Sequence, residues 1–119
     1  MWVWSDAEGT LSRNGRIVSR GYSGLGRGKN NPSMVQAVGV GPIPPGQWKI
    51  AGLADDHDTG PFSIILSPMP GTDTLGRSGF RIHGDSIAHP GQASHGCVIL
   101  PRSIRNEIIA SHDDLFCVV

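Results

Sequence analysis

Apolar and polar residues alternate over short stretches of this chain, which is the pattern of half-buried β-strands. Each stretch ends near glycine, proline or asparagine, the residues that favour turns. The strands predicted from this alternation cover residues 2–4, 10–12, 16–19, 47–51, 62–66, 80–83, 97–100 and 115–119. Asn14-Gly15 predicts a two-residue hairpin between the second and third strands. Residues 21–32 contain too many glycines for a regular element.

One stretch follows a helical period instead of a strand period. Leu100, Ile104 and Ile108 recur every four residues, which places them on one face of a helix over residues 101–110. Pro101 suits the first helical position, where a backbone amide has no partner within the helix. The pattern therefore predicts a mainly β fold, largely antiparallel, with one short helix after Cys97.

Composition supports this picture and places residues 1–119 in a single domain. Hydrophobic residues make up 38% of the 119 residues and charged residues 17%, which fits a globular protein and not a disordered chain. The 17 glycines and 9 prolines favour short strands joined by many turns.

Charge and hydropathy exclude two classes of partner. Ten basic and ten acidic residues balance, with no basic stripe, so we expect no binding to nucleic acid. The longest apolar runs are far too short to span a bilayer, so we expect no membrane insertion. The N-terminal residues lack the basic and apolar regions of a signal peptide. We therefore expect a protein that stays in the cytoplasm or is secreted without a signal peptide.

The two cysteines lie in different surroundings. Cys117 belongs to an apolar strand, where a buried core thiol is expected. Cys97 follows Ser94-His95-Gly96, a polar and flexible segment suited to a reactive thiol. A thiol nucleophile needs a base nearby, and His83 supplies one if its strand lies beside that of Cys97. Alternation places Phe80 and Ile82 toward the core and His83 on the other face.

The residues around this pair extend the same hypothesis. The backbone amides of Gly96 and Cys97 are candidates for an oxyanion hole. Asp85, Ser86 or a backbone carbonyl is expected to orient the imidazole of His83. A zinc site is the rival interpretation, with ligands drawn from His83, Asp85, His89, His95 and Cys97. Their spacing matches no standard zinc motif, so we expect no metal and no other cofactor.

Ser94-His95-Gly96-Cys97, preceded by His83-Gly84, resembles the signature of L,D-transpeptidase (YkuD-like) catalytic domains. A wider set of motifs resembles the type VI secretion L,D-transpeptidase effector family. These motifs are Gly21-Tyr22-Ser23-Gly24, Lys29-Asn30-Asn31-Pro32, Gly41-Pro42-Ile43-Pro44-Pro45-Gly46, Gly76-Arg77-Ser78-Gly79-Phe80, Ile82-His83-Gly84-Asp85 and Ser94 to Cys97. The resemblance implies a YkuD-like β-sandwich or barrel.

The resemblance also implies roles for single residues. Cys97 and His83 become the catalytic pair, and Ser94, His95 and Gly96 complete the catalytic motif. Tyr22, Asp85, Ser86 and Arg102 are expected to bind substrate. The larger enzymes usually carry Arg or Asn shortly after the cysteine, whereas Val98 to Leu100 follow it here. Arg102 and Arg105 are the nearest cations that could hold a substrate carboxylate.

The implied activity is that of an antibacterial effector delivered into the periplasm of a rival cell. Such an enzyme removes or exchanges the terminal D-amino acid of peptidoglycan stem peptides, as an L,D-carboxypeptidase or L,D-transpeptidase. Its expected partners are those stem peptides and a cognate immunity protein. The alternatives are a non-catalytic peptidoglycan-binding module on the same scaffold and a phage-associated wall protein. The intact Cys97 and His83 favour the enzyme.

Overall fold

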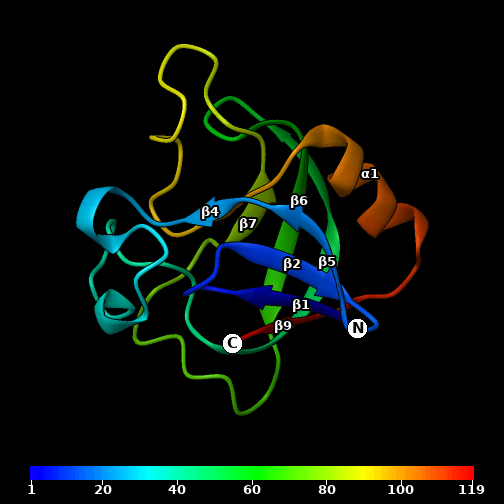
Figure 1. Cartoon of the computed structure of the whole chain (residues 1–119), viewed down its shortest axis with the longest axis horizontal. Helices are drawn as coiled ribbons and strands as arrows, with labels where there is room; N and C mark the ends of the chain where they lie inside the picture. The colour runs from blue at the N-terminus through cyan, green and yellow to red at the C-terminus, as the bar shows by residue number, and fades with distance from the viewer.

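Nine strands form one mixed sheet in the computed structural model, which describes residues 1–119 (Figure 1). The strands are β1 (Trp2–Ser5), β2 (Thr10–Arg13), β3 (Arg16–Arg20), β4 (Tyr22–Ser23), β5 (Gly46–Asp56), β6 (Gly60–Pro68), β7 (Arg81–His83), β8 (Val98–Ile99) and β9 (Leu115–Val118). Two short 3₁₀ helices, η1 (Gly26–Gly28) and η2 (Pro32–Met34), and one α-helix, α1 (Arg102–Ala110), complete the fold. None of the helices has the length and apolar character needed to cross a membrane.

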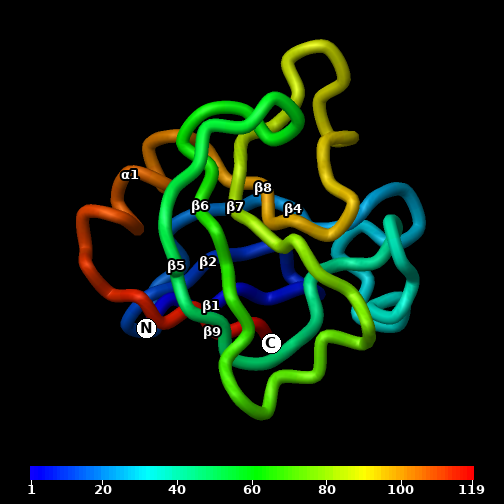
Figure 2. The backbone as a smooth tube through the Cα atoms, turned by 180° about the vertical axis from the view of Figure 1, so that it is seen from behind, coloured from blue at the N-terminus to red at the C-terminus, as the bar shows by residue number.

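The order of the strands brings the two ends of the sheet together. Hydrogen-bonded neighbours run β3-β2-β1-β9-β5-β6-β7-β8-β4, and only Gly21 separates β3 from β4 in the chain. The sheet therefore curls until its first and last strands form one continuous segment, with β4 beside β8 (Figure 2). A Cβ atom on Gly21 would lie 2.0 Å from the carbonyl oxygen of Ile99, so only glycine allows this approach.

Most neighbouring strands are antiparallel, as predicted, but two pairs are parallel. β1 lies parallel to β9, and β7 lies parallel to β8. The connection from β7 to β8, residues 84–97, leaves the sheet as a long loop before the chain returns in its original direction (yellow in Figure 1). Local alternation does not distinguish the two directions, because side chains alternate in the same way in both.

The core follows the predicted alternation along the strands. Trp4 is fully buried beside β9, whose Phe116 and Val118 point inward with it. Trp48 meets Phe80 edge to face, with ring centroids 5.2 Å apart. Cys117 was expected in this core, but it is only half-buried. It lies between two inward-facing residues of β9, so its side chain takes the opposite face.

The glycine-rich segment contains more regular structure than its composition predicted. Tyr22 and Ser23 form β4 and pair with Ile99 and Val98 of β8. The two 3₁₀ helices follow within and just beyond the same segment. The expectation of no regular element was therefore wrong, because pairing with a distant strand compensates for the weak local preference of the glycines.

The helix was predicted within one residue at its start and begins at Arg102, directly after Pro101. Its buried Ile108 packs into the core. Arg105, only 6% exposed, lies three residues before Ile108 and therefore on the same side of the helix. Its guanidinium group donates to the carbonyl oxygens of Leu100, Pro61 and Phe62. This arginine therefore fixes α1 against the start of β6 and the end of β8.

The closure at Gly21 can be tested by adding one methyl group. Gly21→Ala is expected to lower the free energy of unfolding by about 3 kcal/mol or more, since the carbonyl of Ile99 must move. Gly71→Ala is the control, because its Cβ meets nothing within 4 Å and only its positive φ of 91° adds strain, about 1–2 kcal/mol. Urea denaturation measures the free energy of unfolding of both variants. Equal losses of stability in the two would contradict closure at Gly21.

Candidate active site

The strands that carry Cys97 and His83 are direct neighbours. Parallel pairing sets Ile82 beside Val98 and His83 beside Ile99. One residue back along both strands, Cys97 comes level with Arg81. Cys97 and His83 therefore lie on the same face of the sheet, as diagonal neighbours, while Ile82 and Val98 point into the core. Diagonal neighbours lie roughly 7–8 Å apart, and the two side chains bond to backbone carbonyls and not to each other.

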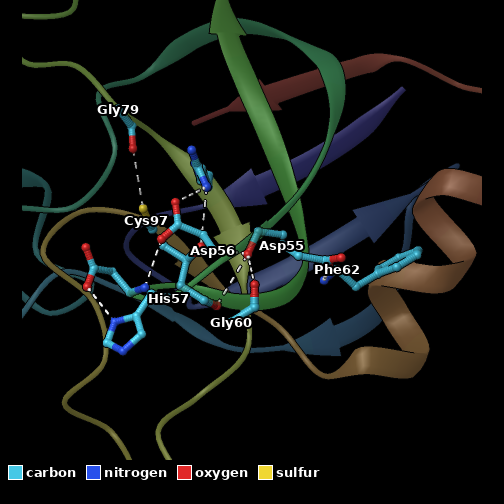
Figure 3. Close-up of polar contacts among 11 residues, drawn as sticks. Asp55, Asp56, His57, Gly60, Phe62, Gly79 and Cys97 are labelled. Carbon is cyan, nitrogen blue, oxygen red and sulfur yellow. Dashed lines mark hydrogen bonds and ion pairs between the residues drawn. The ribbon is translucent and has the colours of Figure 1, made fainter.

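The thiol of Cys97 is half-buried and faces a backbone carbonyl (Figure 3). Its sulfur lies 3.7 Å from the carbonyl oxygen of Gly79, to which the thiol donates. Burial raises the pKa of Cys97, while the backbone amide of Arg81 and the positive charges of Arg81 and Arg77 lower it. Burial is the larger effect, so the resting group is a neutral thiol at pH 7.

The imidazole of His83 is more deeply buried than predicted, with only 4% of the residue exposed. Its Nδ1 lies 2.9 Å from the carbonyl oxygen of Gly84. A carbonyl only accepts, so Nδ1 carries the proton and Nε2 remains free to accept another. Burial lowers the pKa of His83, and the charges of Arg105 and Arg81 lower it further. The ring is therefore neutral at pH 7, as a general base must be.

The structure selects among the groups expected to orient this ring. Neither Asp85 nor Ser86 hydrogen-bonds His83. The carboxylate of Asp85 accepts from the hydroxyl of Tyr22 and from the amides of Ser86 and Gly91. The hydroxyl of Ser86 accepts from the amide of His89. The partner of His83 is thus the backbone carbonyl, the third of the predicted alternatives.

Three hollows line this face of the molecule in a row. Cys97 and Gly79 line the first, of about 330 Å³. His83 lines the second, of about 790 Å³, between the 57–60 turn and the 84–93 loop. His95 is exposed and borders both of these hollows. A third hollow, of about 440 Å³, shares Gly84 and Asp85 with the second. The thiol and the base therefore line adjacent hollows that share His95 in their walls.

Ser94 and Gly96 shape the turn that presents the thiol. Ser94 is fully buried, and its hydroxyl accepts from the amides of Gly24 and Gly96 and donates to the carbonyl of Cys97, 2.5 Å away. The amide of Gly96, a predicted oxyanion donor, is thus already occupied. The amide of Cys97 has no acceptor within the protein, so it remains available beside the sulfur.

Arg77 is a site residue that reasoning from single motifs missed. It is buried, and its guanidinium group donates to the carbonyl oxygens of Val35, Pro42, Gly41 and His95. These bonds join the 35–42 segment to the turn before Cys97. Burial lowers the pKa of Arg77, while the nearby Asp6 and Cys97 raise it. The only sequence signal was its place in the glycine-flanked run 76–80.

Arg81 and the turn between β5 and β6 form a second group that the sequence did not indicate. Arg81 pairs with Asp56, with 2.9 Å between Nη1 and the carboxylate. The same end of the hairpin carries Asp55 and His57 (Figure 3). Residues 57–60 then form one wall of the hollow that contains His83. The hairpin therefore closes the site from the side opposite the 84–97 loop.

The four residues expected to bind substrate lie away from the thiol. Tyr22, Asp85 and Arg102 line the third hollow, and Ser86 lines the second. The zinc ligands considered above do not assemble, because no three side chains of His, Cys, Asp or Glu gather in a geometry that could hold a metal ion.

In a comparison with protein-family models, residues 18–114 match the Tlde1 domain. The chain belongs to the Tlde1 domain family. This family is one of type VI secretion effectors, and membership supports the role of a secreted antibacterial toxin that acts on target cells. Comparison with curated proteins and with solved structures found no match.

The matched residues include all three hollows and the residues expected from the sequence to be catalytic. Three strands of the sheet lie outside it, namely β1, β2 and β9. These strands are neighbours in the strand order and lie away from β7 and β8. The family model thus covers the residues of the candidate site, while β1, β2 and β9 complete the sheet that supports it.

The resting state of the thiol gives a test that needs no substrate. In a Cys117→Ser background, we expect iodoacetamide to modify Cys97 with a rate that rises with pH to a midpoint above about 8.5, the ordinary pKa of cysteine, because burial outweighs the nearby positive charges. Mass spectrometry of the intact protein follows the reaction, with glutathione as reference thiol. Rapid modification at pH 6 would instead reveal a stable thiolate.

Proposed function

We propose that this Tlde1 domain is a cysteine-dependent enzyme acting on peptidoglycan stem peptides, as an L,D-carboxypeptidase, an L,D-transpeptidase or both. The observation that carries the proposal is the pairing of β7 with β8, which sets a half-buried thiol and a neutral imidazole on one face. The free amide of Cys97 beside the sulfur supports it further. The substrate class is inferred from the family resemblance of the motifs.

The first half of the reaction forms a thioester. Nε2 of His83 accepts the thiol proton, directly or through a water molecule, as the sulfur of Cys97 attacks the carbonyl carbon that precedes a D-amino acid. The amide of Cys97 donates to the developing oxyanion. The carbon–nitrogen bond breaks, and His83 returns the proton to the leaving amine. The products are a free D-amino acid and the acyl group on sulfur.

The second half releases the acyl group. A water molecule gives up a proton to His83 while its oxygen attacks the thioester, and the thiolate takes the proton back as it leaves. Hydrolysis in this way is carboxypeptidase activity, and attack by an amine in place of water is transpeptidation. The wide second hollow contains His83 and adjoins the hollow of Cys97 at His95, so we expect either acceptor to enter through it.

The cellular setting follows from the same proposal. Stem peptides of Gram-negative bacteria lie in the periplasm, so an effector with this activity acts there, in a target cell. Loss or exchange of the terminal D-amino acid removes donors for normal cross-linking. A producing cell then needs an immunity protein that blocks the row of hollows described above.

The central test is the mass of a muropeptide. Purified protein is expected to remove D-alanine from disaccharide tetrapeptides, or to exchange it for an added D-amino acid. Cys97→Ala is expected to abolish both reactions because no nucleophile remains. His83→Gln is expected to slow them by about 10²–10⁴-fold through loss of the general base.

Cys117→Ala provides the matched control, since this thiol lies on β9, away from the three hollows. Its activity should equal that of the wild type. Unchanged muropeptides with the wild-type protein, together with retained binding to sacculi, would replace the enzyme with a binding module.

The acid limb of the pH profile tests the state of His83. Catalysis needs the neutral imidazole, and burial lowers the pKa of His83 below its ordinary value of about 6.5. Activity should therefore persist below pH 6.5 and fall only as pH drops through that lowered pKa. Measurement of kcat/KM from pH 4.5 to 8.5 gives the midpoint. An acid limb at or above pH 6.5 would contradict the proposed role of a buried neutral base.

A further inference from the structure

The third hollow gathers three arginines around a cavity of about 440 Å³. Arg20 comes from the end of β3, and Arg102 and Arg105 come from the first turns of α1. Closure of the sheet at Gly21 brings these distant parts of the chain together. The volume falls within the range of small-ligand sites. The concentration of positive charge indicates an anionic ligand.

Arg105 gives the strongest indication because it is buried and only partly paired. Its Nε and Nη1 donate to backbone carbonyls, but its Nη2 has no acceptor within the protein. That nitrogen lies only 2.8 Å from where a Cβ of Gly84 would be, so glycine leaves room for it at the edge of the cavity. A buried guanidinium with unused donors is a strong partner for a carboxylate or phosphate.

The surroundings of Arg105 favour the same kind of ligand. Arg20 is exposed and has no ion-pair partner. Arg102 stacks on Phe62, 4.4 Å from the ring centroid, which holds its guanidinium over the cavity rim. The nine-residue helix α1 starts here without a side-chain cap, so its positive end is also unshielded.

One carboxylate, that of Asp85, borders the cavity, and hydrogen bonds within the protein already engage it. It accepts from the hydroxyl of Tyr22 and from two backbone amides. Burial raises the pKa of Asp85, but these hydrogen bonds, together with the charge of Lys29 over the ring of Tyr22, lower it overall. The three arginines therefore retain a net positive charge for an incoming anion.

The position of the cavity relative to the thiol limits what the anion can be. Leu100 lines the cavity and lies three residues after Cys97, which is about 10 Å along an extended chain. The carboxylate at the end of a leaving D-amino acid is too close to the scissile bond to reach the arginines. A carboxylate on the acyl side of that bond, within about three residues of it, reaches them.

We propose that the cavity lined by Arg20, Arg102 and Arg105 is a subsite for the free carboxylate of the residue that precedes the donor residue, on the acyl side of the peptide substrate. The inference rests on the proposed function, because it takes Cys97 as the point of attack. The γ-linked D-glutamate of stem peptides carries such a free carboxylate one residue before the donor residue. The subsite therefore selects stem peptides whose D-glutamate is not amidated.

The test compares two probes that differ in one group. One is L-Ala-γ-D-Glu-meso-diaminopimelate-D-Ala, and the other carries an α-carboxamide on its D-glutamate. Calorimetric titration uses Cys97→Ala protein, so the probe is not consumed. The carboxylate probe is expected to bind at least about tenfold more tightly than the carboxamide probe, because charged pairs exceed neutral ones in strength.

Single substitutions then show which arginines bind the carboxylate. Arg20→Gln and Arg102→Gln are each added to Cys97→Ala. Each is expected to weaken binding of the carboxylate probe by about five- to tenfold and to leave binding of the carboxamide probe unchanged. Arg16→Gln is the matched control, an exposed arginine of the same strand β3 that does not line the cavity. Arg105 is left intact because it holds the helix.

Each outcome separates the subsite from the activity. Equal affinity for the two probes, no measurable binding of the carboxylate probe, or equal loss for both probes in Arg20→Gln would overturn the subsite. If wild-type protein still releases D-alanine from both probes at equal kcat/KM, the proposed function stands without the subsite. If it releases none while the probes are still discriminated by charge, the subsite stands and the proposed enzymatic function fails.

Discussion

The site depends on the hydrogen bonds that hold the turn before Cys97. The hydroxyl of Ser23 donates to the carbonyl of Gly96 and accepts from the amide of Ile43, while Ser94 and Arg77 bind other backbone groups of the same turn. The side chains of Ser23, Ser94 and Arg77 are buried, where an unpaired polar atom would cost about 1–3 kcal/mol. The turn therefore has one stable arrangement, and it leaves the Cys97 amide unpaired beside the sulfur.

The same bonds explain why motifs far apart in the sequence occur together. Gly21 to Gly24 provides the glycine that admits Ile99 and the hydroxyl that holds Gly96. The 76–80 run provides Arg77, and the carbonyl of Gly79 lies against the thiol. Segments that looked like separate loops are thus the parts of a single support for one cysteine.

Sequence predicted the features that depend on local pattern. Seven of the eight expected strands and the helix were placed within two residues at each end, whereas the strand expected over 47–51 continues to Asp56. The inward positions of Trp4, Ile82 and Phe116 follow from alternation. The motif around Cys97 and the histidine on the preceding strand indicated a candidate nucleophile and a candidate base, and the structure places them on adjacent strands. Non-local features were not accessible, because strand direction, the pairing of β4 with β8 and the carbonyls bound by Arg77 depend on contacts between distant segments. Burial of His83 was missed for the same reason.

The pairing of β1 with β9 has a consequence for the speed of folding. These strands come from opposite ends of the chain, yet they sit side by side within the sheet. The entropy of closing so long a loop must be lost before the contact stabilises anything, and domains dominated by such pairings fold in milliseconds to seconds. Until β9 is in place, the edges of β1 and β5 have no strand partner. The sheet that supports the β7–β8 pair, with its thiol and imidazole, is therefore completed late in folding.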